Sequence, residues 1–203
     1  MSAFLSNLEN NFRKLLPKVD FCSLRIVHNR NENISVNRGI LHPPYQNSDS
    51  GAMVTILDKG GLGYAATSEI TLTGLKQALQ QAHEWAHISA NHSLVDHPVS
   101  RQQNFNGHYS TPVQQPWSTL PLTDKVDLLQ QQSRQLKLDK RIRDWNAALH
   151  YTATQTTYLD SDGVRIEQQI QSLAPMLSVT AYDKGESQNR SFGGDAFLRQ
   201  GGM

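Results

Sequence analysis

Cysteine, charge and long hydrophobic runs are all scarce in this 203-residue sequence. Cys22 is the only cysteine, so no internal disulfide bond can form, which is typical of proteins from a reducing compartment. The first residues lack the long apolar segment of a signal peptide. No run of about 18 apolar residues, the length that spans a membrane, is present. These absences predict a cytoplasmic chain with no membrane partner.

The sequence also has no large excess of charge of one sign, because its 19 Lys and Arg residues are balanced by 18 Asp and Glu residues. A net charge of +1 gives no electrostatic reason to expect a nucleic acid as partner. The longest basic cluster, residues 137–143, is interrupted by Leu138, Asp139 and Ile142, and we interpret it as the solvated end of a helix. The common nucleotide-binding motifs, G-x-G-x-x-G and the P-loop, do not occur.

Hydrophobic periodicity predicts about three helices. The first is expected at residues 5–16, ending before Pro17. The second runs from Thr71 or Thr73, as a capping residue, to about Ala90, and the third from Thr123, as a capping residue, to Leu136. Between the last two, residues 91–122 have no hydrophobic period and are rich in proline and polar residues. We expect an irregular surface loop there.

The remaining segments alternate with the period of a strand. Hairpins are expected at residues 22–40, with a polar turn over residues 29–32, and at residues 53–66, with a glycine turn. Further strands over residues 144–192, with turns at residues 160–163 and 183–186, suggest an antiparallel meander. No strand-helix-strand alternation occurs, so a parallel doubly wound sheet is not expected. The predicted fold class is α+β, with antiparallel hairpins and a meander packed against the helices.

A candidate metal site lies in residues 82–90, which read AHEWAHISA. His83, Glu84 and His87 form the H-E-x-x-H motif of zinc peptidases. On a helix the two imidazoles lie one turn apart and can bind one zinc ion, while the glutamate acts as general base on the bound water. A hydrolytic zinc site also needs a third protein ligand.

That third ligand has no obvious candidate. One class of zinc peptidases would have a histidine at position 93, but Ser93 stands there, and His92 is about 100° away around the helix. The other candidates lie in the strand-rich part or in the irregular loop: Glu167, Glu186, Asp96, His97 and His108. His83 and His87 also lie about 100° from the apolar stripe of their helix, which favours solvated side chains.

Other residues whose side chains could bind a metal or a ligand or act in catalysis are expected to have structural roles. Cys22 is expected to be a small core residue. Asp160 and Asp162 begin like a calcium loop, but Gly163 comes too early and no glutamate follows at the twelfth position, so a hairpin turn is expected. The tryptophans Trp85, Trp117 and Trp145 are expected to anchor packing.

Residues 51–82, GAMVTILDKGGLGYAATSEITLTGLKQALQQA, contain an ordered series of short motifs. A strand ends in a glycine turn, and then come G-Y-A-A-T, E-I-T at a helix start, and G-L-x-x-A-L-x-x-A. This order resembles the N-terminal domain of the TldD/PmbA family, also called modulators of DNA gyrase. FCSLRIVHNRNENISVNRGI, LPLTDKVDLLQQQSRQLKLDKRI and YLDSDGVRIEQQIQSLAPMLSVTA resemble other parts of that domain, so the resemblance spans residues 1–195.

The resemblance implies a zinc-dependent metallopeptidase family, active in proteolysis of extended or unfolded peptides, whose members form homodimers or heterodimers. The family's metal motif, H-E-x-x-x-H, lies in its C-terminal half. The segment at His83 has one intervening residue fewer and lies in another domain, so no catalytic, cofactor-binding or metal residue carries over. We expect residues 1–195 to form the N-terminal domain and residues 196–203 to begin the following region. Zinc is then expected only in the missing C-terminal half.

Three functions remain open at this point. The first is a non-catalytic domain that shapes peptide access and subunit contacts in a larger TldD/PmbA-like peptidase. The second is a self-contained zinc hydrolase that uses His83, Glu84 and His87. The third is a non-enzymatic interaction module. Whether the chain itself is an enzyme depends on a third ligand in the second case, and on residues beyond position 203 in the first.

Overall fold

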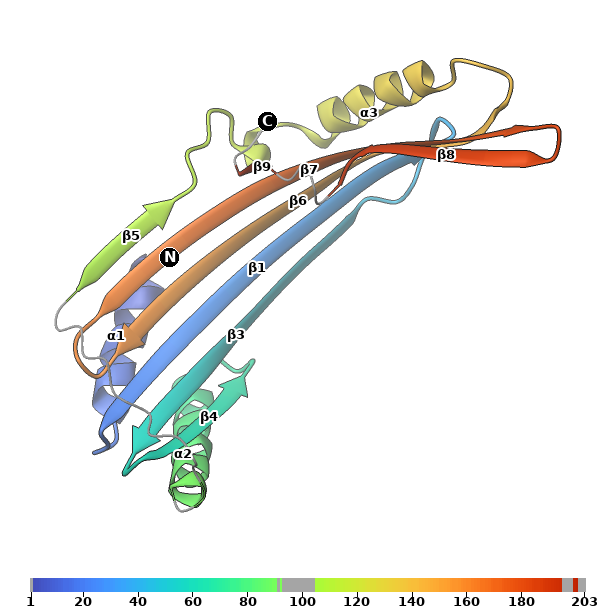
Figure 1. The fold of residues 1–203 in the computed structure, drawn as a ribbon. Coiled ribbons are helices and arrows are strands. Elements are labelled where there is room, and N and C mark those ends of the chain that lie inside the picture. Colours follow the sequence, from blue (N-terminus) through green and yellow to red (C-terminus); the bar gives the residue numbers. More distant parts are fainter. Residues whose placement is uncertain (1, 91, 93–104, 195–198, 201–203) are drawn as a thin grey trace. The chain divides into compact units, whose positions relative to one another are not determined.

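The computed structural model describes residues 2–90, 92, 105–194 and 199–200. These residues form three α-helices, a short 3₁₀ helix and a nine-stranded sheet (Figure 1). The helices are α1 (Ser2–Leu15), α2 (Leu72–Ser89), α3 (Leu122–Leu136) and the 3₁₀ helix η1 (Trp117–Thr119). The strands are β1 (Phe21–Asn37), β2 (Ile40–Leu41), β3 (Tyr45–Asp58), β4 (Gly61–Thr67), β5 (Asn106–Ser110), β6 (Ile142–Asp160), β7 (Arg165–Asp183), β8 (Glu186–Gly193) and β9 (Arg199–Gln200). The predicted α+β class is confirmed.

The sheet has the strand order β4-β3-β1-β6-β7-β5, with β2 on β1 and with β8 and β9 on β7. The hairpins β3–β4 and β7–β8 pair antiparallel, as expected from their glycine turns. Internal contacts divide the chain into two units. The first contains Met1–His28, Asp49–Tyr109 and Gln155–Gln168, and the second contains Asn29–Ser48, Ser110–Thr154 and Gln169–Met203.

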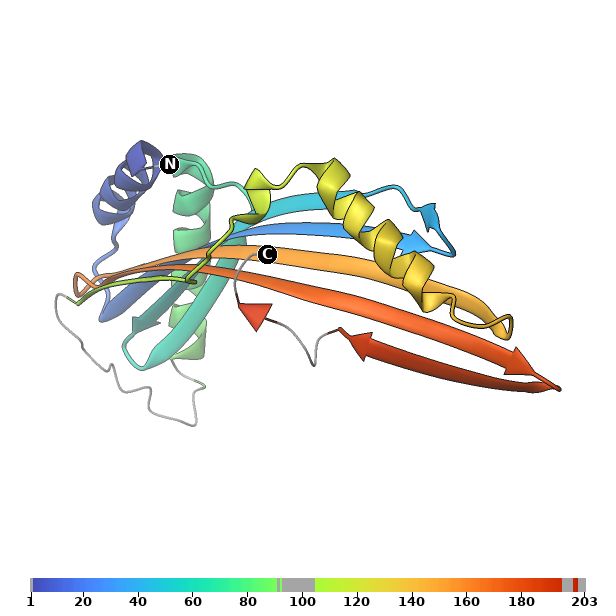
Figure 2. The same cartoon turned by 90° about the horizontal axis from the view of Figure 1, so that it is seen from above.

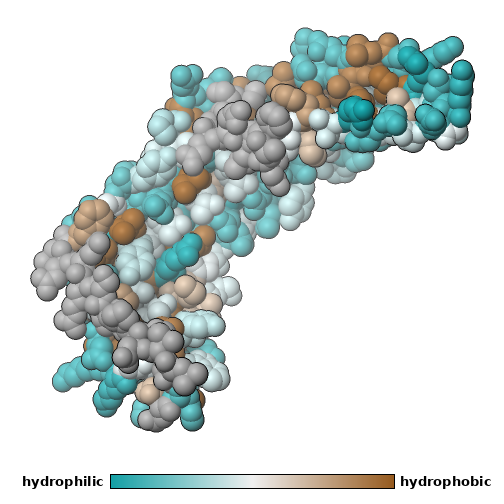
Figure 3. All heavy atoms as spheres, in the orientation of Figure 1, coloured by the Kyte–Doolittle hydropathy of each residue, from teal (hydrophilic) through white to brown (hydrophobic). Residues whose placement is uncertain are grey.

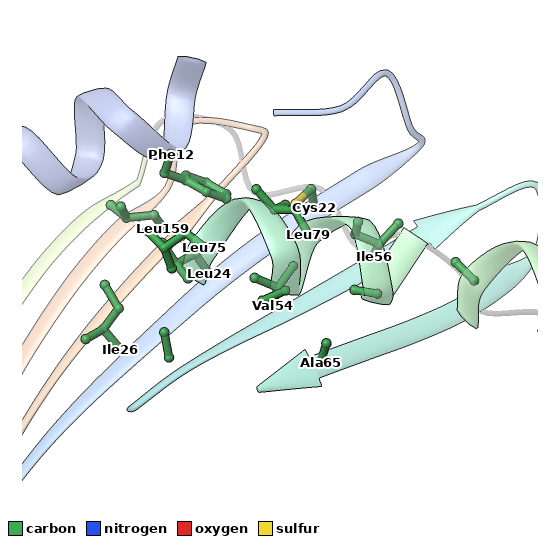
Figure 4. Close-up of a cluster of buried hydrophobic side chains, with 14 residues drawn as sticks. Phe12, Cys22, Leu24, Ile26, Val54, Ile56, Ala65, Leu75, Leu79 and Leu159 are labelled. Atoms are coloured by element: carbon green, nitrogen blue, oxygen red, sulfur yellow. The ribbon is translucent and has the colours of Figure 1, made fainter. Parts of the chain in front are cut away.

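The core of the first unit lies between the helices α1 and α2 and the strands β1, β3 and β4. Figure 4 shows Phe12 reaching from α1 into a cluster of side chains from these elements. Its largest members are Phe12, Leu24, Ile26, Ile56, Leu75, Leu79 and Leu159. The helix α2 begins where predicted, because Thr71 Oγ1 accepts a hydrogen bond from the Gly74 N–H at 3.2 Å.

Two glycines let α2 lie directly on β4. A Cβ atom at Gly61 would be 1.9 Å from the Ala86 carbonyl oxygen, and one at Gly63 would be 2.0 Å from the Ala82 carbonyl oxygen. Neither position can hold a side chain without moving the helix backbone. The G-L-G spacing therefore sets the distance between this strand and the helix that carries His83.

The core of the second unit lies beneath α3, which runs along one face of β1, β6 and β7 (Figure 2). Leu129 of α3 is buried, and Val126 and Leu136 pack beside it, as the helical spacing predicts. The strands contribute Ile34, Val36, Ala147, Leu149, Tyr151 and Leu173. Alternate residues of each strand therefore face the helix.

Three local predictions are wrong. Residues 22–40 are not a hairpin with a turn over residues 29–32, because β1 runs without interruption to Asn37 and turns only at Arg38 and Gly39, which have φ of 50° and 81°. The expected loop over residues 91–122 contains β5 and η1, although residues 91 and 93–104 lie outside the described part. Thr123 does not cap α3, since Pro121 holds the capping position without a side-chain hydrogen bond.

Hydrophilic side chains dominate the face seen in Figure 3, and hydrophobic ones gather only in small patches. The described helices include none that has both the length and the apolar character needed to cross a membrane.

Candidate functional site

The H-E-x-x-H residues lie on the last turns of α2 and point away from the core. The buried face of this helix is formed by residues 74, 75, 78, 79, 82 and 86, whereas His83, Glu84 and His87 are all exposed. Among the described residues, His83 lies near one carboxylate, that of Asp58 at the end of β3, whose Oδ2 is 3.6 Å from His83 Nε2. The expectation of solvated histidines is confirmed for both side chains.

No described residue completes a zinc site with His83 and His87. Within the described ranges, no group of three or more His, Cys, Asp or Glu side chains is placed to hold a metal ion. His92 lies in an exposed turn after α2, and His108 is on β5 with Nδ1 3.9 Å from Glu167 Oε2. Ser93, Asp96 and His97 lie outside the described residues.

Cys22 is a core residue, as predicted, with none of its surface exposed. Burial raises the pKa of its thiol to about 12, because the thiolate would lose its hydration in the apolar core. A neutral, enclosed thiol is neither a nucleophile nor a metal ligand at neutral pH. Cysteine chemistry is therefore excluded at this position.

The Asp160–Gly163 segment forms a hairpin turn, as expected. Asp160 Oδ1 accepts hydrogen bonds from the backbone N–H groups of Asp162 and Val164, each at 2.9 Å. The carboxylate thus holds the turn between β6 and β7 closed. The interpretation as a turn rather than a calcium loop agrees with this geometry.

A charged network joins α1, β5 and β7 in the first unit. Arg165 Nη1 donates to Glu9 Oε2 at 2.7 Å, and Arg165 Nη2 donates to Glu167 Oε1 at 2.5 Å. The hydrogen bond to Glu167, more than the field of Glu9, raises the pKa of Arg165. Arg13 and His108 also line the adjoining hollow of about 550 Å³. Because acidic and basic groups alternate here, the network neutralises itself and ties α1 to the sheet.

A buried polar cluster in the second unit was not anticipated from the sequence. Lys125 of α3 has a side chain only 6% exposed, and its Nζ lies 3.3 Å from Glu32 Oε1 and 3.7 Å from the Trp117 ring centroid. Trp117 Nε1 donates to the other oxygen of Glu32 at 3.0 Å, and its ring stacks on Tyr151. The cluster fixes η1 and α3 onto β1. Its only sequence signal was a tryptophan in a polar segment.

Of the three tryptophans, two behave as predicted. Trp117 is buried, and Trp145 is partly buried and donates from Nε1 to Ser133 Oγ at 3.1 Å. Trp85 is 53% exposed on α2, so its assignment as a packing anchor is wrong.

The outer edge of β4 is partly closed by a side chain of α2. The backbone N–H and C=O groups of Leu62 point away from β3. The N–H donates to Ser89 Oγ and the C=O accepts from the same hydroxyl, both at 2.8 Å. Because backbone groups alternate in direction along an antiparallel strand, those of Tyr64 and Ala66 also point away from β3. Within the described part of the chain, their outward backbone groups have no hydrogen-bond partner.

Two family models match this chain. The model described as PmbA/TldA metallopeptidase domain 1 matches residues 22–86, and the model described as the PmbA/TldA metallopeptidase central domain matches residues 115–201. No curated protein matches the chain.

Solved structures of similar fold cover nearly the whole chain. A proposed modulator of a DNA gyrase from Thermotoga maritima has 14% identity and a TM-score of 0.71, over 98% of this chain and 43% of its own. One from Bacteroides thetaiotaomicron has 14% identity and a TM-score of 0.64, over 94% and 43%. TldE from Thermococcus kodakarensis has 15% identity and a TM-score of 0.65, over 94% and 42%. The chain thus spans less than half the length of each of these proteins. The two family models together match most of its residues, and the chain belongs to the PmbA/TldD family.

Proposed function

We propose that this chain is the non-catalytic N-terminal part of a PmbA/TldD-type metallopeptidase, and that it shapes the access of extended peptides and contributes subunit contacts. The observation that carries the proposal is the match to metallopeptidase domain 1 and the central domain over residues 22–86 and 115–201. The exposed, incomplete ligand set at His83 and His87 supports placing the zinc chemistry outside this chain.

Peptide access has a structural candidate at the outer edge of β4. An extended peptide can add to a sheet edge through main-chain hydrogen bonds, which recognise it without regard to sequence. The open stretch at Tyr64 and Ala66 offers such groups, and the Ser89 hydroxyl on Leu62 limits how far a peptide can extend. Fluorescence anisotropy of a labelled extended peptide tests this edge. Ala66→Pro, which removes an outward N–H, should weaken binding, and Ala66→Ser is the matched control that keeps it.

A self-contained zinc hydrolase is the competing function, and it is favoured only by the H-E-x-x-H sequence motif. Elemental analysis of the dialysed chain separates the two. We expect far less than one zinc per chain, and no change in metal content on replacing His87 by alanine. One zinc per chain, lost in His87→Ala, would make His83, Glu84 and His87 the active site. A full-length protein without any metal motif after residue 203 would favour the non-enzymatic interaction module.

A further inference from the structure

The strand β8 has one edge paired and one edge open. It pairs antiparallel with β7 from Asp183↔Glu186 to Met176↔Gly193, and no other described strand lies beside it (Figures 1 and 2). Seven of its eight residues are exposed, and its sequence, ESQNRSFG, contains no proline. It is longer than either end strand of the sheet order, β4 or β5.

The turn before β8 determines which backbone groups face the open edge. Lys184 and Gly185 have φ of 48° and 88°, as in a two-residue hairpin turn, so Asp183 and Glu186 form the first hydrogen-bonded pair. The N–H and C=O groups of Ser187, Asn189 and Ser191 then point outward. The Asn189 side chain agrees with the register, because its Nδ2 donates to Oγ1 of Thr180, the residue opposite, at 2.9 Å.

Two charges of opposite sign stand four residues apart on this strand. Glu186 and Arg190 share one face of β8, and neither has an ion-pair partner among the described residues. Arg190 Nη1 instead donates to the outward carbonyl of Asn189 at 2.7 Å. Charges on an edge strand commonly prevent pairing with other chains. Here, however, their spacing allows them to neutralise each other across a twofold axis.

We propose that β8 pairs with β8 of a second copy of this chain, antiparallel, with the twofold axis at Gln188. In that register Ser187 and Asn189 form the hydrogen-bonded pairs, and each Glu186 lies directly opposite Arg190 of the other copy. The arrangement uses outward backbone groups only, so the β7–β8 hairpin stays intact. An axis at Arg190 would set two arginines against each other, and an axis at Asn189 would leave all four charges without partners. This pairing places the subunit contact of the proposed function on β8. The expectation that two copies associate at all rests on that proposed function.

Sedimentation equilibrium over a wide concentration range tests the pairing. We expect a monomer–dimer equilibrium whose dissociation constant rises about tenfold in Glu186→Arg and in Arg190→Glu, because each sets like charges opposite each other twice. The double variant Glu186→Arg/Arg190→Glu should restore association, since the opposite charges face each other again. Arg143→Glu, an exposed change on β6 with the same charge difference as Arg190→Glu, is the control and should leave association unchanged.

Two further variants test the backbone register itself. Asn189→Pro removes an outward N–H and the side-chain hydrogen bond to Thr180, but it removes no main-chain hydrogen bond to β7. Association should therefore be lost while the far-ultraviolet circular dichroism spectrum stays the same. Gln188→Cys, in a Cys22→Ala background, should form a covalent dimer on oxidation, because the two residues meet at the axis. A chain that stays monomeric at all concentrations overturns the proposal. A dimer unaffected by these variants also overturns it, while leaving subunit contact through another surface, and hence the proposed function, intact.

Discussion

Replacing Glu32 by alanine is expected to destabilise the second unit more than any other single polar substitution in it. The Lys125 and Glu32 side chains are only 6% and 12% exposed, so neither charge can regain full hydration when its partner is lost. Removing one member of a buried ion pair costs about 3–5 kcal/mol, since the other charge stays buried without a partner. Here the Trp117 N–H loses its acceptor at the same time.

The double variant Glu32→Leu/Lys125→Met separates this cost from ordinary loss of packing. Replacing both charges with apolar side chains of similar size is often neutral, and the unpaired Trp117 N–H then costs about 1–3 kcal/mol. The double variant should therefore be more stable than Glu32→Ala alone. Urea unfolding followed by far-ultraviolet circular dichroism measures both, because tryptophan fluorescence would respond to the cluster itself. Equal losses in the two variants would refute the reasoning.

Three other changes have defined outcomes. Gly63→Ala should lower the free energy of unfolding by at least about 3 kcal/mol, because its Cβ would overlap the Ala82 carbonyl. Gly51→Ala is the control, since its Cβ would lie 3.6 Å from its nearest neighbour, and it should cost less than about 1 kcal/mol. Thermal unfolding measures both variants. The free energy of unfolding should fall by up to about 1.4 kcal/mol per pH unit above pH 9.0. In that range the Cys22 thiol loses its proton in the unfolded chain but keeps it in the folded chain, where its pKa is about 12. This extra slope should be absent in Cys22→Ala. Ser89→Ala should speed amide hydrogen exchange at Leu62, with no change at Gly63, which bonds β3, and equal rates at Leu62 in both chains would contradict the edge assignment.

The course of β1 shows where sequence reasoning failed. Residues 29–32 are polar, and a polar segment between apolar ones reads as a turn. In the structure Asn29 and Asn31 each accept a hydrogen bond from a threonine hydroxyl of β6, Thr154 at 3.0 Å and Thr152 at 3.1 Å. These partners are more than 100 residues away in sequence, so no local pattern could have revealed them. Polar strand residues with distant partners look like turns until the sheet is known.

The parts predicted correctly depend on local signals. Turn glycines at positions 60 and 185, the Thr71 cap and the apolar stripe of α2 each act within a few residues of themselves, and the structure confirms all of them. The orientation of His83 and His87 followed from the same helical stripe. The missing third ligand could be judged only from spacing, since a metal site depends on side chains that tertiary structure brings together.

Metal content of the purified chain tests the central claim most directly. The account predicts far less than one zinc per chain after mild dialysis, with the same value in His87→Ala, because His83 and His87 lie exposed on α2 and no third ligand stands beside them among the described residues. One zinc per chain, removed by His87→Ala, would contradict the account and assign zinc hydrolysis to this chain itself.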